Sequence, residues 1–451
     1  MTCYPIYDLK KRLPESAFVI FPVFQCERAK VIWLNEPLLE YYKSNTPIEI
    51  DDDVNNWVID RFAYRAASRS KSGMSKYMYA ERYGGEGIGF NGGGARVALN
   101  GYFQAKGCGR TPLSSELTDA EHQSGVCCFN EVVKEALWGE VGNAIFPNGA
   151  VRTLAIISYM NTENGSLSFI SVRENALRPA HFIRAVYCKL SSVTEHNMQD
   201  IIRTIDNVSE MTSEINIKIL FKKYFKQWAQ QIAFMQANRI MHGAITCSNL
   251  ALDGRMIDFG TMTTLGKHCA VITAYKQYEF WREPEIVKSI IFKLLNSINR
   301  YNSTKFHLDV NYYAGYYLKV FYLYHEYFIL RLFNVHFISG DKRRELYNNI
   351  VYFLRKFESE PFFGVPRYSC FSRLDAIYSN LIEYALCNDD CVIDNERYES
   401  ACQQHHSISK FDIDFLNVDV IDKEIADLQG AGLSIDGYIN GKIENAKRVF
   451  L

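Results

Sequence analysis

The hydrophobic residues of this chain occur in two different patterns. Short apolar runs between polar residues, as at 18–21, 151–160 and 166–172, are typical of β-strands. Over 217–241 the apolar residues recur every three or four positions, which predicts a helix with one buried face. Further helices are predicted at 129–137, 284–298 and 312–337. The pattern therefore predicts an α+β fold whose strands come first and whose C-terminal region is helical.

Changes in this pattern divide the chain into three parts. Residues 1–75 form a strand-containing leader that we expect to pack against the neighbouring region, 76–190. Residues 76–190 contain a glycine-rich segment and then strands, and residues 191–451 are mainly helical. Because 451 residues exceed the length that one hydrophobic core usually supports, we expect a body with two lobes.

Composition narrows the functional classes. Apolar residues make up 48% of the chain, which indicates a globular protein, and the net charge of −1 gives no reason to expect a nucleic-acid partner. The 12 cysteines form no C-x-x-C pair, so we expect free thiols rather than zinc. No secretory segment opens the chain, which predicts a cytoplasmic protein. Charges at Lys319, Glu326 and Arg331 interrupt the apolar segment 312–333, so we expect no membrane span.

A glycine-rich segment at 83–96 has the composition of a phosphate-binding loop. Glycine has no side chain, so backbone N–H groups can approach a phosphate closely. Tight hairpin turns are an alternative explanation, because a glycine run alone is a weak signal. The candidate nucleotide-binding glycines are Gly85, Gly87, Gly89, Gly92 and Gly93.

Beyond the glycines, the polar residues have the order of a kinase-like nucleotide site. Lys106 ends a strand-like run, and Glu131 lies on the next helical segment, as in the lysine–glutamate pair of kinase folds. His242 and Asn249 are seven residues apart, the interval of the kinase catalytic loop, and Asp258 begins a literal D-F-G. Asn249 and Asp258 carry oxygen ligands of the kind that Mg²⁺ prefers.

Three motifs together resemble the selenoprotein O family of atypical kinase folds that transfer AMP. They are Tyr83-Gly84-Gly85-x-x-x-Gly89, Lys106-Gly107-Cys108-Gly109-Arg110-Thr111-Pro112, and the segment from His242 through Asn249 to Ile257-Asp258-Phe259-Gly260. In the second motif only Cys108 departs from the family, which has alanine there. The resemblance covers about residues 80–265 and implies a bilobal protein-kinase-like fold. In that fold 76–190 would be the N-lobe-like region, and 191–451 the C-lobe-like region with the catalytic loop.

The resemblance also implies ATP and Mg²⁺ as cofactors and assigns roles to single residues. Lys106 and Glu131 would form the ion pair that directs the lysine toward phosphates. Arg173 and Arg178 correspond to two arginines that hold the terminal phosphates of a nucleotide bound in a flipped orientation. Arg110 belongs to the second motif and would join the nucleotide site. The α-phosphate of ATP would then face an acceptor hydroxyl, and pyrophosphate would leave.

The chain departs from the family in the catalytic loop. Ser248 stands in the catalytic position where the family has aspartate, so the metal ligand Asn249 remains but the general base is missing. Arg173 and Arg178 are five residues apart, closer than in the family, and the acidic residue of the turn before Arg96 is absent. Beyond residue 270 the resemblance ends.

The missing base has two interpretations. A positioned base contributes a factor of about 10²–10⁴, so its loss could leave a weak enzyme or a nucleotide-binding scaffold. Alternatively, the acceptor is a carboxylate, which is already ionised near neutral pH and needs no base. Lys106, Arg173 and Arg178 with Mg²⁺ could then supply the electrostatic stabilisation. Selenoprotein O-like proteins from gene clusters that mature siderophore-linked antimicrobial peptides of the microcin type would suit the second interpretation.

Three functions are compatible with these observations. The first is an adenylyltransferase that acts on a protein or peptide substrate, including activation of a peptide carboxylate. The second is a non-catalytic pseudokinase that binds ATP and scaffolds a partner modifying enzyme. The third, γ-phosphoryl transfer, is disfavoured by the two arginines and by the lack of an aspartate in the catalytic loop.

Overall fold

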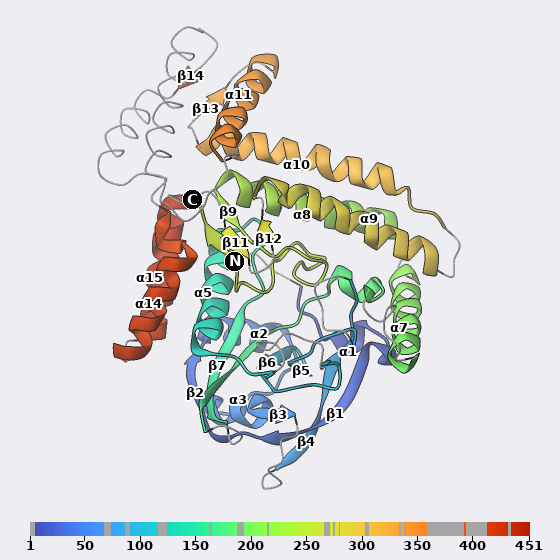
Figure 1. Ribbon diagram of the computed structural model, residues 1–451, viewed down its shortest axis with the longest axis vertical. Helices are drawn as coiled ribbons and strands as arrows, with labels where there is room; N and C mark the ends of the chain where they lie inside the picture. The colour runs from blue at the N-terminus through green and yellow to red at the C-terminus, as the bar shows by residue number, and fades with distance from the viewer. Residues whose placement is uncertain are drawn as a thin grey trace.

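The protein combines one large antiparallel sheet with a helical C-terminal region (Figure 1). This agrees with the predicted order of strands before helices. The structure is a computed structural model, and it describes residues 5–66, 74–85, 91–115, 124–161, 165–186, 194–213, 216–265, 271–273, 276–278, 280–302, 306–332, 335–337, 340–358, 392–393, 413–431 and 434–451.

The sheet has eight strands in the order β2-β7-β8-β6-β5-β4-β1-β3, and all neighbouring strands are antiparallel. Three of its strands, β1, β2 and β3, come from the first 75 residues, so this segment is part of the same sheet as the glycine-rich region. The strands are β1 (Phe18–Gln25), β2 (Glu27–Leu34), β3 (Tyr64–Ala66), β4 (Ser75–Glu81), β5 (Val97–Asn100), β6 (Phe103–Lys106), β7 (Thr153–Met160) and β8 (Leu167–Glu174).

A single residue, Cys26, joins β1 to β2, although these strands lie toward opposite ends of the sheet. β1 pairs with β3 and β4, whereas β2 pairs with β7. The chain can make this connection only if the twisted sheet curls and brings its two ends together near Cys26. Arg28, the second residue of β2, lies close to this connection. Its backbone φ of 51° is in the left-handed region, so the chain turns sharply here as it passes from β1 into β2.

Two helices that the pattern of apolar residues did not predict, α2 and α3, lie in the first 75 residues. Each begins at a side-chain cap, where Asn35 accepts a hydrogen bond from the Leu38 amide and Asp53 accepts one from the Asn56 amide. The α-helices that the structure describes before residue 150 are α1 (Leu9–Arg12), α2 (Glu36–Asn45), α3 (Val54–Phe62) and α5 (Phe129–Ile145).

The C-terminal region contains long helices, of which α8 and α10 lie side by side and α15 packs against α5 (Figure 1). Three of the predicted helices, at 217–241, 284–298 and 312–337, correspond to α8, α9 and α10, but two were predicted too long. α8 ends at Ala237 and α10 ends at Leu332, and the predicted helical residues 240–241 and 335–337 are short strands instead. The helices of this region are α7 (Thr194–Ser213), α8 (Ile217–Ala237), α9 (Glu283–Tyr301), α10 (Val310–Leu332), α11 (Gly340–Glu358), α14 (Val418–Ala431) and α15 (Ile435–Phe450).

Short strands outside the large sheet close the loops of the C-terminal region. β9 and β10 pair with each other, and this pairing closes the loop that contains Ser248, Asn249 and Asp258. Trp228 on α8 donates from Nε1 to the carbonyl of Ala251 at 2.9 Å, which ties the same loop to the helical core. The short strands are β9 (Ile240–Met241), β10 (Thr263–Thr264), β11 (Val271–Thr273), β12 (Lys276–Tyr278), β13 (Val335–Phe337) and β14 (Val392–Ile393).

Alternation along β6 and β8 separates an apolar face of the sheet from a polar one. Phe103 and Ile170 pack with α2 and α3 in one apolar cluster. Gln104, Lys106 and Arg173 belong to the opposite face, where Lys106 and Arg173 contact a carboxylate of α5. Successive residues of a strand point to opposite faces, so a strand that buries apolar residues against α2 and α3 presents polar ones to α5.

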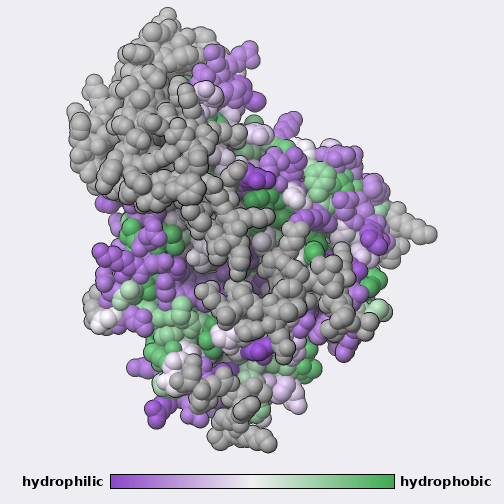
Figure 2. Space-filling model, in the orientation of Figure 1, coloured by the Kyte–Doolittle hydropathy of each residue, from purple (hydrophilic) through white to green (hydrophobic). Residues whose placement is uncertain are grey.

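The surface mixes hydrophilic residues with small hydrophobic groups on the face shown in Figure 2. Exposed apolar residues such as Ile219 and Leu323 lie on α8 and α10. In the part of the chain that the structure describes, none of the helices combines the length and the apolar character that crossing a membrane requires.

Candidate functional site

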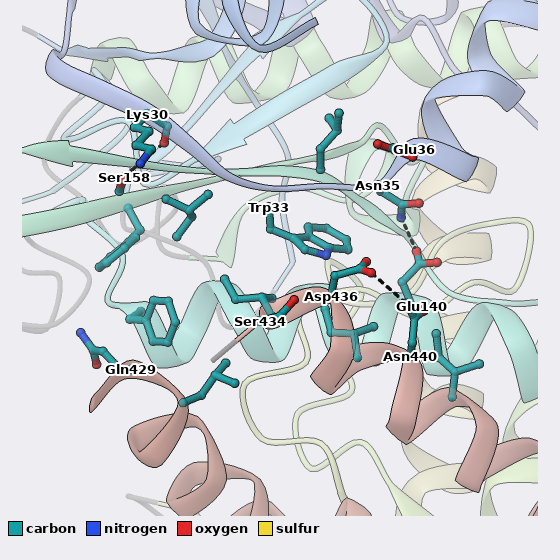
Figure 3. A pocket seen from close by; sticks show the side chains of 18 of the residues that line it. Lys30, Trp33, Asn35, Glu36, Glu140, Ser158, Gln429, Ser434, Asp436 and Asn440 are labelled. Carbon is teal, nitrogen blue, oxygen red and sulfur yellow. Dashed lines mark hydrogen bonds between the residues drawn. The ribbon is translucent and has the colours of Figure 1, made fainter. Parts of the chain in front are cut away.

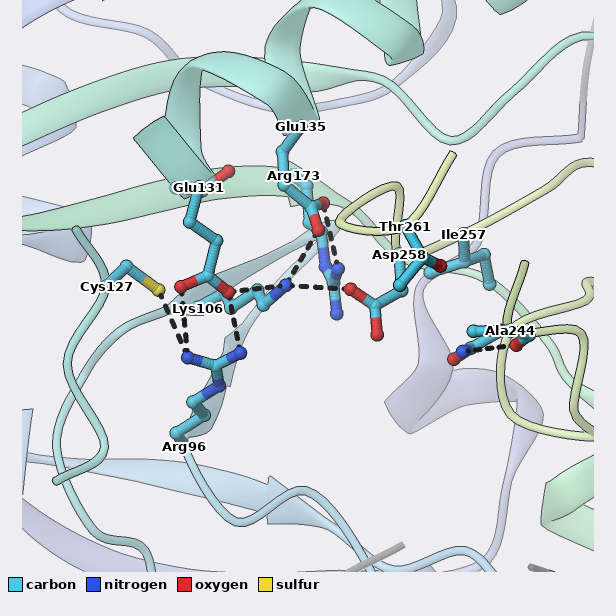
Figure 4. Close-up of polar contacts among 12 residues, drawn as sticks. Arg96, Lys106, Cys127, Glu131, Glu135, Arg173, Ala244, Ile257, Asp258 and Thr261 are labelled. Atoms are coloured by element: carbon cyan, nitrogen blue, oxygen red, sulfur yellow. Dashed lines mark hydrogen bonds and ion pairs between the residues drawn. The ribbon is translucent and has the colours of Figure 1, made fainter. Parts of the chain in front are cut away.

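Lys106, at the end of β6, is the centre of a buried charge cluster (Figure 4). The residue is 4% exposed. Its Nζ lies 2.7 Å from Oε1 of Glu135, 3.1 Å from Oε1 of Glu131 and 3.1 Å from Oδ1 of Asp258. Asp258 is 152 residues away along the chain, so the fold brings the lysine motif and the D-F-G segment into direct contact.

Two glutamates of α5 hold the cations of the cluster. They are four residues apart and therefore lie on one face of the helix. Glu135 is 2% exposed and binds Lys106 through Oε1 and Arg173 through Oε2, the latter at 3.2 Å. Glu131 is nearer the surface and accepts both guanidinium branches of Arg96, at 2.6 and 3.2 Å. The predicted ion pair between Glu131 and Lys106 is therefore present, but Glu135 is the more buried of the two glutamates that contact this lysine.

Arg173 and Arg178 lie next to each other within the cluster, and both are buried. Arg173 Nε and Arg178 Nη2 each donate to Oε1 of Gln104 at 3.2 Å. Arg178 Nη1 also donates to the backbone carbonyl of Ser248 at 3.2 Å. The pair therefore connects the sheet to the loop after α8.

A glutamate–histidine pair holds Arg178 from the other side. The backbone N–H of Arg178 donates to Nδ1 of His181 at 2.9 Å, so the ring proton lies on Nε2, which bonds to Oε1 of Glu81. Burial lowers the pKa of His181, although Glu81 opposes this effect. Burial raises the pKa of Glu81, but Arg178 and His181 outweigh it, and the net shift is downward. Glu81 is therefore a buried carboxylate beside a neutral imidazole.

Electrostatics keeps the central groups of the cluster ionised. Burial opposes the charge of Lys106, but Asp258, Glu135 and Glu131 outweigh burial and raise its pKa. The cation of Lys106 is the main reason why the pKa of Asp258 is lowered. The Asp258 side chain is 44% exposed, and its backbone has φ of 67°. A left-handed backbone at a residue other than glycine is uncommon, and it often marks a functional position.

His242 supports the catalytic-loop segment from inside the core. The ring is fully buried, and its Nε2 donates to the carbonyl of Ile257 at 3.0 Å, while its Nδ1 accepts from the amide of Ala244 at 3.3 Å. Burial lowers its pKa. Because both ring nitrogens are used, His242 orients the residue before Asp258 and has no nitrogen left for a substrate.

Ser248 and Asn249 lie on the same loop. Ser248 Oγ lies 2.9 Å from Oγ1 of Thr246, and Asn249 Nδ2 donates to the carbonyl of Ala244 at 3.0 Å. The amide of Ile257 donates to the Asn249 carbonyl at 3.1 Å, which connects the loop to the residue before Asp258. Asn249 uses its amide nitrogen inside the loop, which orients its side-chain oxygen.

The described glycines of the glycine-rich segment are buried by packing. A Cβ added at Gly85, where φ is 90°, would lie 1.8 Å from Sγ of Cys247. At Gly93 it would lie 2.4 Å from the carbonyl oxygen of Glu81, and Gly92 has φ of 74°. Close packing and left-handed backbone therefore account for glycine at these three positions.

Three other predicted nucleotide contacts do not belong to the described cluster. Gly87 and Gly89 lie outside the described residues. Arg110 is exposed at the surface, and none of its side-chain contacts joins it to Lys106 within the described part of the chain. The second motif therefore contributes its first residue, Lys106, to the charge cluster.

Four residues of the cluster were not predicted as site residues: Glu81, Gln104, Glu135 and Arg96. Two of them carry a signal in the sequence. Glu135 shares a helix face with Glu131, and Gln104 shares a strand face with Lys106, so each position is consistent with the period of its element. The other two depend on contacts between segments distant in sequence.

The cluster has features that fit a magnesium–nucleotide complex. Arg178 Nε is buried without a hydrogen-bond partner, which leaves a donor for an anion. No group of three His, Cys, Asp or Glu side chains is arranged to hold a metal among the described residues. Mg²⁺ would therefore rely on Asp258, Asn249 and the phosphates of its ligand, a donor set that suits this ion.

The charges of the cluster are balanced before any ligand binds. The cations are Lys106, Arg96, Arg173 and Arg178, and the carboxylates are Glu81, Glu131, Glu135 and Asp258. A divalent cation at Asp258 would compete with Lys106 for this carboxylate and give the site a net positive charge. A polyphosphate and its metal ion would thus favour each other's binding.

Comparison with protein-family models finds no match to this chain, and comparison with curated proteins finds none either.

Proposed function

We propose that the Lys106 cluster binds ATP with Mg²⁺ and transfers AMP to a protein or peptide acceptor. In this proposal the large sheet with α5 is the N-lobe-like half of a kinase-like bilobal arrangement, and the helical region is the C-lobe-like half. The observation that supports it most is the convergence of Lys106, Asp258 and the pair Arg173 and Arg178, because these come from three segments distant in sequence. A strand lysine, a glutamate of a helix and an aspartate ligand for Mg²⁺ together are the parts of a phosphate-transfer site.

The two arginines favour AMP transfer over γ-phosphoryl transfer. Arg173 and Arg178 are buried, and their shared acceptor, Oε1 of Gln104, holds the two guanidinium groups close together. Terminal phosphates bound there would point into the protein, and the α-phosphate would be the group that faces an acceptor. Guanidinium forks bind phosphate oxygens through two parallel donors, and they keep their charge throughout the reaction.

The catalytic loop favours an acceptor that is already ionised. Ser248 Oγ bonds to Thr246 and Asn249, and a serine hydroxyl is not a base at neutral pH. A carboxylate oxygen of the acceptor can attack the α-phosphorus directly, forming an acyl–AMP bond while the bond to pyrophosphate breaks. The cations then stabilise the charge that passes to the leaving group. Activation of a peptide carboxylate is therefore the reaction that we expect.

A second function fits the same loop. With Ser248 in place of an acid, the protein could bind ATP without turnover and act as a scaffold for a partner modifying enzyme. The balanced charge of the cluster favours this alternative, because Lys106 and Asp258 stabilise each other without a ligand.

The test is incubation with Mg²⁺ and ATP labelled in the α- or γ-phosphate, with pyrophosphate release measured in parallel. Candidate carboxylate peptides and hydroxyl peptides serve as acceptors, and hydroxylamine traps acyl–AMP as a hydroxamate. The variants are Lys106→Met and Asp258→Asn, with Lys218→Met as a matched control because Lys218 is an exposed lysine of α8. Circular dichroism checks that each variant is folded.

Each outcome decides between the functions. Transfer of the α-label with hydroxamate formation, lost in both site variants and kept in Lys218→Met, supports AMP transfer to a carboxylate. Transfer of the γ-label alone identifies a kinase and overturns the proposal. ATP binding without pyrophosphate release from any acceptor supports the scaffold.

A further inference from the structure

A cavity of about 950 Å³ lies between the sheet and the C-terminal helices, and Lys106 is not among its lining residues. Its walls come from β2, β7 and β8, from α5, and from α14 and α15 (Figure 3). This volume is at the upper end of the range that is usual for ligand-binding pockets. The cavity therefore has room for several side chains of a partner, and its lining indicates which ones.

The floor of the cavity is apolar. Trp33 from β2, Phe129 from α5 and Phe169 from β8 form one side, and Ile439 from α15 forms the other. Phe129 and Phe169 are in contact, with ring centroids 5.4 Å apart. A ligand that fills this space would therefore have to bring a large apolar side chain.

Trp33 carries a buried donor that has no acceptor. The residue is 7% exposed, and its Nε1 lacks a hydrogen-bond partner. In Figure 3 the indole nitrogen points into the cavity, toward the side where Asp436 lies. A buried N–H group without a partner is costly, and a carbonyl oxygen from a ligand would satisfy it.

The rim near Trp33 is acidic. Glu36 and Asp436 line the cavity and are exposed to solvent at its mouth. Glu140 also lines it, but both of its oxygens are occupied by Arg152, at 2.7 Å each. Lys30 lies toward the other end, beside Ser158 (Figure 3). Oδ2 of Asp436 accepts a hydrogen bond from Asn440 Nδ2 at 3.0 Å, but both exposed carboxylates at the Trp33 end keep their negative charge for a cation.

We propose that this cavity binds a peptide segment of a partner protein in which a large apolar side chain is followed by a basic one. The apolar side chain would occupy the space between Phe169 and Ile439. A backbone carbonyl would accept from Trp33 Nε1, and the basic side chain would pair with Glu36 and Asp436. The proposal is independent of the nucleotide chemistry, because it uses no residue of the Lys106 cluster.

The probes are two pools of fluorescein-labelled tetrapeptide amides with Phe, Leu or Ile at the second position. One pool has arginine at the third position and the other has glutamate. Fluorescence anisotropy with the full chain should give saturable binding of the arginine pool and weaker binding of the glutamate pool. Equal binding of both pools, or no binding of either up to about 1 mM, overturns the proposal.

Variants test each wall of the cavity. Trp33→Phe removes the donor and should weaken binding about fivefold, whereas Trp57→Phe, whose indole donates to the Glu49 carbonyl elsewhere, should leave it unchanged. The double change Glu36→Gln and Asp436→Asn should weaken binding about fivefold at low salt and less at high salt. Asp427→Asn on α14 is the matched charge control, because Asp427 is exposed and does not itself line the cavity. Equal losses in the test and control variants also overturn the proposal.

Discussion

Arg173 and Arg178 donate to the same oxygen, Oε1 of Gln104, from Nε and Nη2 at 3.2 Å each. Two buried guanidinium groups repel each other, so their proximity needs a compensating structure. Glu135 provides it for Arg173 at 3.2 Å, and Glu81 provides it for Arg178 at 3.7 Å. The arginines are therefore held in place before any anion arrives, which is the arrangement that a phosphate site requires.

Replacing either arginine by lysine should weaken ATP binding while the charge is kept. Lysine is a point charge and cannot reproduce the guanidinium fork, so we expect Arg173→Lys and Arg178→Lys each to lower Mg–ATP affinity about tenfold. Arg184→Lys is the control, because Arg184 pairs with Asp200 outside the cluster. Isothermal titration calorimetry measures the affinities. Unchanged affinity in both site variants would contradict an anion site at this position.

The two glutamates of α5 should differ in their contribution to folding. Glu135 is the buried partner of both Lys106 and Arg173, and breaking a buried pair costs about 3 kcal/mol, so Glu135→Gln should reduce the free energy of unfolding by about that amount. Glu131 is nearer the surface, and Glu131→Gln should cost about 1 kcal/mol. Urea unfolding followed by circular dichroism measures both.

A surface ion pair gives the reference for this comparison. Glu40→Gln removes an exposed contact to Lys43 and should change stability by less than about 0.5 kcal/mol. If Glu131→Gln proves as costly as Glu135→Gln, then the charge is shared equally, and burial does not decide which glutamate holds the lysine.

The sequence predicted those parts of the fold in which the apolar residues of a single helix or strand recur at a regular spacing. The row of apolar residues along one face of α8 and the position of Lys106 at the end of a strand are both local features, and the structure contains both. α2 and α3 were missed, although Asn35 and Asp53 cap them, because their apolar positions are few and the caps alone are short signals. The strand order of the sheet was beyond prediction, since β2 pairs with a strand more than a hundred residues later.

The site was predictable to the extent that its residues belong to motifs. Lys106, Glu131 and Asp258 lie in contact, and their motifs are visible in the sequence. Glu81 and His181 could not be found in this way, because each is a single polar residue whose role depends on packing against a segment 100 residues distant. The glycine-rich segment is the opposite case, because its composition indicated a phosphate-binding loop. In the structure, the close approach of Cys247 is sufficient to explain why residue 85 is glycine.

A methyl group at Gly85 should be destabilising mainly because of Cys247. An added Cβ would meet Sγ at 1.8 Å, and the left-handed backbone adds strain, so Gly85→Ala should cost about 3 kcal/mol. Gly101 also has a left-handed backbone, with φ of 62°, but a Cβ added there would have no atom within 4 Å. Gly101→Ala therefore measures the cost of the backbone strain alone, which we expect to be about 1 kcal/mol. Thermal or urea unfolding measures both costs.

Removing the sulfur should relieve the clash. We expect the double variant Gly85→Ala with Cys247→Ala to be more stable than the sum of its single changes by about 1–2 kcal/mol. Additive costs would mean that the methyl group is accommodated by movement of the backbone, with the sulfur in place.

Acidification should destabilise the protein through His242, whose pKa is lowered by burial. Its unfolded pKa is about 6.5, so below that pH the unfolded state binds a proton that the folded state excludes. The stability linked to neutral His242 is therefore complete above pH 6.5 and declines as the pH falls. Asp258 and Glu135 oppose the shift without reversing it. Urea unfolding at pH 7.5 and about pH 5.5 should show a loss of about 1 kcal/mol from this residue.

His242→Gln separates this effect from other acid-sensitive groups. Glutamine can still donate to the Ile257 carbonyl but does not titrate, so the variant should be less stable at pH 7.5 and lose less on acidification. His307→Gln is the control, because His307 is exposed, and it should keep the pH dependence of the unmodified chain. An unchanged pH dependence in His242→Gln would assign the acid sensitivity elsewhere, and His181, which is also buried and whose pKa is lowered, is the residue to test next.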